Sequence, residues 1–216
     1  MISYITRKRG GNKLLLLIKK DFYIQKMAWV LIILAIAAYI FAEASPLFVG
    51  IIFCIVMLAN LLAMDDKKST QLLLNSLPFT RKEIVISKYV TAFLYVILIV
   101  LSIAMLHFAF HQTWPNVYHL LMIFTFGLFV ASFWYPFAYR FGSKYFQFFL
   151  IGVFAAYLIC LRFFIPNLHD RIREFVSMLT TASQPSMYVY ITCAMLVLFC
   201  LSLLVSIRIY SNKVLE

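Results

Sequence analysis

Apolar residues gather along this chain in six long runs that are separated by shorter, more polar segments. The runs cover Met27–Ala42, Pro46–Met64, Tyr89–Phe110, Tyr118–Tyr139, Phe146–Ile165 and Tyr188–Ile207. An α-helix needs about 20 apolar residues to cross the hydrocarbon core of a bilayer, and most of the runs are near this length. The first run would reach only about 24 Å, so either Lys26 extends to the headgroups or the helix begins nearer Phe22. The pattern predicts an all-α membrane protein with six transmembrane helices in a single domain, residues 1–216.

The loop between the second and third runs, residues 65–88, is longer and more charged than a turn between two membrane helices requires. Its first part, Lys67–Leu77, is predicted to form a short helix with a narrow apolar stripe at Leu73 and Leu77. Pro78 disfavours a helical conformation at the residue before it, so it ends this helix.

A second helix start follows directly in the sequence T-x-x-E at residues 80–83. The Thr80 and Glu83 side chains are placed to form a capping box, which predicts that the third transmembrane helix begins at Arg81. Two helices that meet at a proline form a stiff elbow, which favours a docking surface with a mechanical role. An ordinary amphipathic cytoplasmic loop is the alternative.

The amino-terminal segment, residues 1–26, is basic and is predicted to lie in the cytoplasm and the membrane interface. Gly10 and Gly11 are expected to form a flexible joint, and Asn12 is a permitted N-cap for a helix that follows. Residues Lys13–Lys26 mix leucines with lysines, which is typical of a helix that lies in the interface. The alternative is a charged flank that only sets the topology.

The distribution of charge predicts the orientation of the chain. Only 12% of the residues are charged, about half the fraction of an ordinary soluble domain. Sixteen of the nineteen Lys and Arg residues lie in the amino-terminal segment, the loops after the second and fourth runs, and the tail. Because basic residues favour the cytoplasmic side, both termini are predicted to be cytoplasmic. The net charge of +11 is thus assigned to topology and anionic lipid, not to nucleic acid.

The loop before the last run, residues 166–187, is predicted to be extracellular and helical, because apolar residues recur there at helical spacing. Arg162 lies just inside the fifth run, where an arginine is costly unless it reaches water, headgroups or a partner. Asp170 and Glu174 are candidate partners for it at the outer end. The alternative is that Arg162 extends to the headgroups by itself.

Aromatic residues make up 18% of the chain and concentrate in the fourth and fifth runs. The default interpretation is lipid contact; the alternative is an adaptable apolar route for a cargo. The candidate residues for such a route are Phe126, Phe129, Phe133, Trp134 and Phe137. Since the runs hold no carboxylates or paired charges, a hydrated solute would find no satisfied polar route. Amphipathic peptides or other hydrophobic, toxic compounds fit best.

Several catalytic motifs are absent from the sequence. It has no G-x-x-x-x-G-K-[ST] phosphate-binding loop, no H-E-x-x-H and no G-x-S-x-G. The chain is therefore not expected to be an enzyme, and ATP hydrolysis would require a separate subunit. No metal site or cofactor is expected, and the cysteines within the runs are predicted to be buried small hydrophobes.

The loop motif carries a resemblance to a known family. The stretch LLLNSLPFTRKEIVISKY, preceded by MDDKKST, resembles the cytoplasmic loop of bacterial ABC-2 type permeases, which often reads L-L-x-S-L-P-x-[ST]-R-K-x-I-V-x-[AS]-K-Y. The segment LLLLIKKDFYIQK is similar to the interfacial helix before their first span. The small size also resembles the permeases of the staphylococcal phenol-soluble modulin exporter, which expel amphipathic helical peptides.

The resemblance implies a permease in a bacterial cell membrane that works as a dimer, with a second copy or a related permease. Two ABC ATPase subunits would bind ATP and Mg and would dock on the helix Lys67–Leu77. The residues assigned to this coupling are Asp65, Asp66, Lys67, Lys68, Leu73, Leu74, Leu77 and Pro78. The expected function is ATP-driven export. A non-transporting scaffold, immunity or sensor subunit that recruits an ATPase is the alternative.

Overall fold

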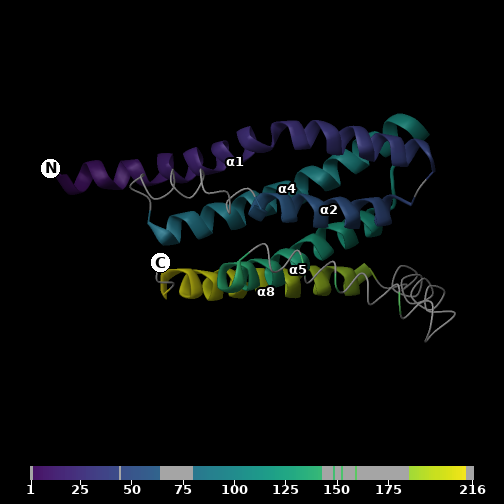
Figure 1. Ribbon diagram of the computed structural model, residues 1–216. Helices are drawn as coiled ribbons and strands as arrows, with labels where there is room; N and C mark the ends of the chain where they lie inside the picture. Colours follow the sequence, from purple (N-terminus) through teal and green to yellow (C-terminus); the bar gives the residue numbers. More distant parts are fainter. Residues whose placement is uncertain are drawn as a thin grey trace.

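The structure is a computed structural model that describes residues 2–43, 45–63, 80–142, 148, 152, 159 and 185–212, with side chains from residue 14 onward except residues 185 and 186. This part of the chain contains five long helices and no strand (Figure 1). They are α1 (Ile2–Phe41), α2 (Pro46–Ala63), α4 (Arg81–His111), α5 (Val117–Phe141) and α8 (Pro185–Asn212). Each is long and apolar enough to cross a bilayer.

The all-α membrane class is therefore confirmed, and five of the six predicted runs coincide with observed helices. The predicted fifth span, Phe146–Ile165, lies outside the described residues apart from three isolated positions. The predicted helix Lys67–Leu77 and most of the loop 166–187 also lie outside them.

The first helix differs from the expectation for the amino-terminal segment. Helix α1 continues through Gly10, Gly11 and Asn12, so the predicted joint and the helix start at Asn12 are wrong. A glycine costs a helix only about 1 kcal/mol relative to alanine, so two glycines permit a break without enforcing one. The separate interfacial helix is not confirmed, because Lys13–Lys26 and the first span form one helix. The membrane candidate within it, Leu14–Phe41, has 28 residues and a length of about 42 Å.

The directions of the helices follow from the contacts between them. Asp21 meets Lys88 and Phe41 meets Phe110, so α1 and α4 run in the same direction. Tyr89 meets Ser202, while Arg81 meets Ser211, so α8 runs opposite to α4. Helix α4 contacts each of the other four described helices and is the centre of the bundle. Both termini lie at the same end (Figure 1).

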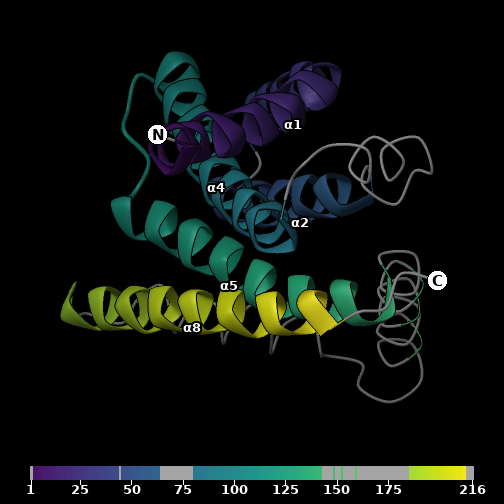
Figure 2. The ribbon, with the colours of Figure 1, turned by 90° about the vertical axis from the view of Figure 1, so that its left-hand side faces the viewer.

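Helices α5 and α8 form the most extensive contact, and they lie side by side in the same direction (Figure 2). Contacts recur at every seventh residue of α5, which is close to two helical turns, so these residues share one face. The pairs are Tyr118 with Tyr188, Thr125 with Thr192, Ser132 with Ser202, and Tyr139 with Tyr210. The polar and aromatic groups along this face hold the two helices in a fixed register.

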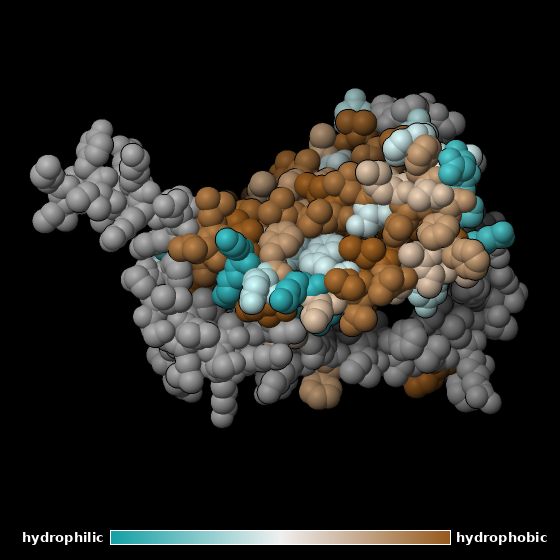
Figure 3. Space-filling view, turned by 90° about the horizontal axis from the view of Figure 1, so that it is seen from above, coloured by the Kyte–Doolittle hydropathy of each residue, from teal (hydrophilic) through white to brown (hydrophobic). Residues whose placement is uncertain are grey.

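The exposed surface along α1 is largely hydrophobic (Figure 3). Leu15, Leu31 and Leu34 are each about two-thirds exposed there. One side of the same helix is buried and carries the residues Leu17, Asp21, Gln25, Ile32, Ile36 and Ile40. An apolar outer surface is expected of a helix that faces lipid.

Glycines allow α2 and α4 to approach α5 closely. A Cβ atom at Gly127 of α5 would lie 2.8 Å from both methyl groups of Val96 in α4. At Gly50 of α2 it would lie 2.5 Å from Cδ1 of Ile123 in α5. Small residues at such crossings let backbones come together, which is a main source of helix association in membranes.

We therefore expect Gly127→Val to destabilise the bundle by about 2 kcal/mol, since a rotation of Val96 cannot clear both methyl groups at once. Thermal unfolding of the purified chain in detergent measures this. Gly152→Val is the control, because within the described part of the chain no atom lies within 4 Å of its Cβ position. Equal unfolding temperatures for the two variants would contradict the close crossing.

Candidate functional site

Helix α4 begins at Arg81, as the T-x-x-E pattern predicts. The Thr80 N–H donates to Oε2 of Glu83 at 2.8 Å, and the Glu83 N–H donates to Oγ1 of Thr80 at 3.3 Å, which completes the capping box. Nη1 of Arg81 donates to the carbonyl oxygen of Ser211 in the last turn of α8 at 3.0 Å. The start of α4 is thus fixed in direction and joined to the end of α8.

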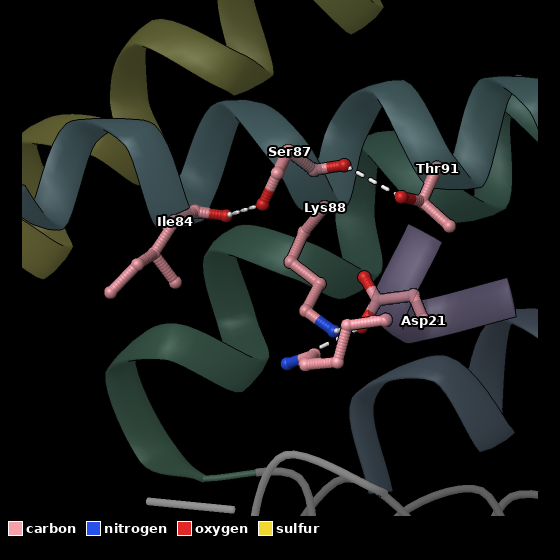
Figure 4. A network of polar contacts seen from close by, with 6 residues as sticks. Asp21, Ile84, Ser87, Lys88 and Thr91 are labelled. Carbon is pink, nitrogen blue, oxygen red and sulfur yellow. Dashed lines mark hydrogen bonds and ion pairs between the residues drawn. The ribbon is translucent and has the colours of Figure 1, made fainter. Parts of the chain in front are cut away.

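A buried ion pair joins α4 to α1 (Figure 4). Nζ of Lys88 donates to Oδ1 of Asp21 at 2.8 Å, and the two side chains are only 3% and 4% exposed. Nζ of Lys20, which is more exposed, lies 3.5 Å from the same oxygen. Asp21 lies in α1 and Lys88 in α4, each before the predicted span of its helix, Met27–Ala42 and Tyr89–Phe110.

The pair lies just outside the predicted spans Met27–Ala42 and Tyr89–Phe110, so the expectation that the spans hold no paired charges stays a prediction. The sequence pattern assigned Asp21 to the interface and Lys88 to the loop, because each is followed by a longer apolar run. The structure includes both residues in the helices that form those spans. A buried ion pair contributes little net stability, but removing one partner leaves an uncompensated charge and costs roughly 3–5 kcal/mol.

Of the other polar groups near the ion pair, some have hydrogen-bond partners and some do not. Oγ of Ser87 donates to the carbonyl of Ile84, and Oγ1 of Thr91 donates to the carbonyl of Ser87, both within α4 (Figure 4). In contrast, Oδ2 of Asp21 and the whole Gln25 side-chain amide are buried without a hydrogen-bond partner among the described residues. Buried polar groups in this state are costly. Near Asp21 and Lys88, the contact between α1 and α4 is therefore weaker than an apolar contact of the same area.

A directed chain of hydrogen bonds joins α4 to α5 and α8. The hydroxyl of Ser202 donates to the carbonyl of Ser132, which can only accept. The Tyr89 hydroxyl lies 2.7 Å from Ser202 Oγ and must donate to it, since the Ser202 hydrogen is already used. The Ser206 hydroxyl, also 2.7 Å away, must then donate to Tyr89. The order is Ser206 to Tyr89 to Ser202 to the Ser132 carbonyl.

Pro136 explains why the chain of hydrogen bonds ends at Ser132. Pro136 lies inside α5 and has no N–H, so the carbonyl four residues earlier, that of Ser132, lacks its usual helical donor. In a bilayer such a carbonyl must be satisfied by another part of the protein. The Ser202 hydroxyl of α8 supplies this donor. The proline therefore makes the contact between α5 and α8 a requirement at this depth.

These contacts define a cluster at the base of α4, which we call the α4 base: Thr80, Arg81, Glu83, Lys88 and Tyr89 with their partners. Adjacent residues Lys88 and Tyr89 reach different neighbours, α1 through Asp21 and α8 through Ser202 and Ser206. The cluster follows directly after residues 64–79 in the sequence. A displacement of the first two turns of α4 would accordingly move α1, α5 and α8.

The sequence-predicted site residues have different outcomes. Thr80, Arg81 and Glu83 come together as the cap. The coupling residues from Asp65 to Pro78, and the outer residues Arg162, Asp170 and Glu174, lie outside the described residues, so their roles stay predictions.

The five candidate residues of a cargo route do not share one surface. Phe129, Phe133 and Phe137 are between one-third and two-thirds exposed along one side of α5, and Phe126 continues this stripe. Trp134, at 2% exposure, lies in the core of the bundle instead.

Sequence reasoning missed Asp21, Lys88, Tyr89, Ser202 and Ser206. One signal for Asp21 and Gln25 was present, because they continue the spacing of the buried stripe Leu17, Ile32, Ile36 and Ile40 toward the amino terminus. That spacing places a carboxylate on the packed face of α1. A lysine within the apolar stretch I-V-I-S-K-Y-V was the matching signal in α4.

The described helices define a multi-pass membrane protein. Over residues 16–211 the chain matches the model of a family described as ABC-2 family transporter protein, and it belongs to that family. It is thus a transmembrane permease subunit of an ABC transporter, distinct from the ATPase with which such permeases normally work. No curated protein and no solved structure matched the chain. The narrower likeness to the phenol-soluble modulin exporter stays a prediction.

The ion pair leads to a prediction about two single variants and the double variant that combines them. Asp21→Asn and Lys88→Met should each lower the free energy of unfolding by roughly 3–5 kcal/mol, while the double variant should lie closer to the unmodified protein than either single variant. Thermal unfolding in detergent measures all three. Lys19→Met, at an exposed position of the same helix, is the control. Additive losses in the double variant would show that the two charges do not stabilise each other.

The chain of hydrogen bonds that ends at the Ser132 carbonyl leads to a second prediction. Ser202→Ala should cost about 1–3 kcal/mol, because it leaves the Ser132 carbonyl without a donor. The cost should shrink in a Pro136→Ala background, where an N–H returns to α5. Ser102→Ala, which removes a hydroxyl bonded only to its own helix, is the control and should be nearly neutral. An equal cost of Ser202→Ala in both backgrounds would sink this account.

Proposed function

We propose that this chain is the permease of an ATP-driven exporter that moves amphipathic peptides or other hydrophobic compounds out of the cell. In this proposal two permeases, either two copies or one copy and a related chain, associate with two ABC ATPase subunits that bind ATP and Mg. Both termini face the cytoplasm, as the distribution of Lys and Arg predicts, and the cell is bacterial, as the resemblance of the loop motif implies. The segment Lys67–Leu77 docks on the ATPase.

The observation that carries the proposal is the place of the α4 base in the chain. It begins at Thr80, with only Pro78 and Phe79 between it and the predicted docking segment, and is joined by hydrogen bonds and an ion pair to α8 and α1. The cap fixes the direction of the first turn, so a push on Thr80 would act on the helix axis and not on a frayed end. The ion pair holds α1 to α4 at this cluster, so a push on the start of α4 would reach α1 as well.

Six crossings also suit the directions of the helices. Helix α5 ends at the end of the bundle that holds both termini, whereas α8 begins at the opposite end (Figures 1 and 2). A crossing by the predicted span Phe146–Ile165 would account for this change of end. It would also leave both termini on one side.

The composition of the bundle beyond the α4 base favours a hydrophobic cargo. Residues 27–42, 46–63, 89–111, 117–139 and 185–207 contain no Asp, Glu, Lys or Arg. Between α5 and α8 lies a hollow of about 210 Å³ whose lining includes Phe126, Phe129 and three methionines, Met122, Met187 and Met195. Methionine side chains adapt to many apolar shapes, which suits a cargo of variable structure.

Transport by the reconstituted complex tests the proposal. Vesicles that contain the permease and its ATPase should move a fluorescent amphipathic helical peptide in an ATP-dependent manner. Thr80→Ala with Glu83→Ala removes the cap, which is worth about 1 kcal/mol, and should lower transport more than it lowers co-purification of the ATPase.

The matched control is Asn116→Ala, which removes the cap of α5 at the other end of the bundle. It should leave transport nearly unchanged. Equal losses in the two variants would assign the Thr80 cap to stability alone. A complex that binds its ATPase but moves no peptide would support the scaffold alternative and overturn the export proposal.

A further inference from the structure

A second hollow lies between α5 and α8, nearer the end of the bundle that holds the termini. It has a volume of about 440 Å³, which is within the usual range for sites that bind small molecules. Its walls are mainly apolar and include Phe133, Phe137, Leu201 and Val205. Ser132 and Ser202 also line it, but their hydroxyl hydrogens are donated to the carbonyls of Leu128 and Ser132. An occupant would therefore find an apolar surface along most of the hollow.

One cationic group breaks this apolar lining. Arg140 lines the hollow in the last turn of α5, and its side chain is exposed. Its guanidinium lies 5.4 Å from the ring of Phe141, and no carboxylate of the described residues forms a salt bridge with it. The helix dipole favours a cation in the last turn, which explains a basic residue at this position. It does not explain why the residue lines a hollow with apolar walls.

We propose that this hollow binds one anionic phospholipid of the cytoplasmic leaflet, with its phosphate on Arg140 and an acyl chain against Phe133, Phe137, Leu201 and Val205. The positive-inside pattern predicts that the Arg140 end faces the cytoplasm, where anionic headgroups lie. A guanidinium binds phosphate through two parallel hydrogen bonds. Phe133 and Phe137 also belong to the candidate cargo route, but a cationic amphipathic peptide would meet repulsion from Arg140, so this end of the route suits an anionic lipid better than such a peptide.

The position of the lipid would give it an effect on the bundle. Ser202 and Ser132 line the hollow and also belong to the chain of hydrogen bonds that joins α4, α5 and α8. A bound acyl chain would pack beside these hydrogen bonds. It would thereby favour the arrangement in which α5 and α8 stay together. The proposal requires that α5 and α8 lie in a membrane with Arg140 on the cytoplasmic side, and it stands apart from the question of transport.

Photo-crosslinking tests the site. The full chain is placed in nanodiscs of phosphatidylcholine with a trace of phosphatidylglycerol that carries a diazirine in its acyl chain, and labelled peptides are mapped after irradiation. Labels should concentrate on the hollow-lining residues of α5 and α8. Arg140→Gln should lower this labelling about fivefold, the effect expected of one basic residue near a membrane surface.

Arg208→Gln is the matched control, because Arg208 is exposed in α8 but does not line the hollow. Val205→Phe should also reduce labelling by filling the hollow, whereas Val197→Phe, at an exposed position of α8 away from it, should not.

Three results would overturn the proposal. One is equal labelling by the phosphatidylcholine analogue, which would indicate unselective contact with lipid. Another is an equal loss in the Arg140 and Arg208 variants. The third is chain-to-chain crosslinking through the hollow in place of lipid labelling, which would make this face an interface with a second copy.

Discussion

The ion pair between Asp21 and Lys88 joins α1 to the rest of the bundle at the α4 base. In water, burial of apolar surface would hold α1 in place, but within a bilayer lipid tails are as apolar as leucine and this driving force is lost. Close packing and polar contacts then decide which helices associate. Helix α1 has both kinds of contact with α4: the ion pair near one end, and the edge-to-face packing of Phe22 and Trp29 on Tyr95. The ion pair also favours one register, since a shift by one residue would pull the two buried charges apart.

The need to satisfy polar groups within the bilayer also shapes the opposite side of the bundle. Pro136 removes a backbone donor from α5, and the Ser202 hydroxyl of α8 replaces it. Because the hydroxyl of Tyr89 donates to Ser202, α4 is joined to the same contact. A residue that would weaken an isolated helix thereby makes three helices depend on one another. Contacts between α5 and α8 recur every seven residues along α5, whereas the contact between α1 and α4 leaves Oδ2 of Asp21 and the Gln25 amide without a hydrogen-bond partner among the described residues.

Local and periodic features could be predicted from the sequence, and features that depend on distant residues could not. Five long helices follow from apolar runs, and the start of α4 follows from Thr80 and Glu83, which lie three residues apart. The expected joint at Gly10 and Gly11 failed because glycine allows many conformations and the flanking residues favour a helix. Asp21 and Lys88 are 67 residues apart, and nothing in either local pattern names the other as its partner. Pro136 predicts a broken hydrogen bond in α5, but not that Ser202 repairs it.

The location of the polar contacts also bears on how such a bundle could move. The charged contact between α1 and α4 lies near the end that holds the termini, while near the opposite end these helices meet through the rings of Phe41 and Phe110. Ring contacts are weakly directional and tolerate sliding, whereas an ion pair 2.8 Å long does not. If the ATPase acts on the α4 base as proposed, α1 and α4 would pivot about Asp21 and Lys88. The largest separation would then fall at the far end, where only apolar surface becomes exposed to lipid. Such an opening is inexpensive in a bilayer and admits an apolar face more readily than a hydrated solute.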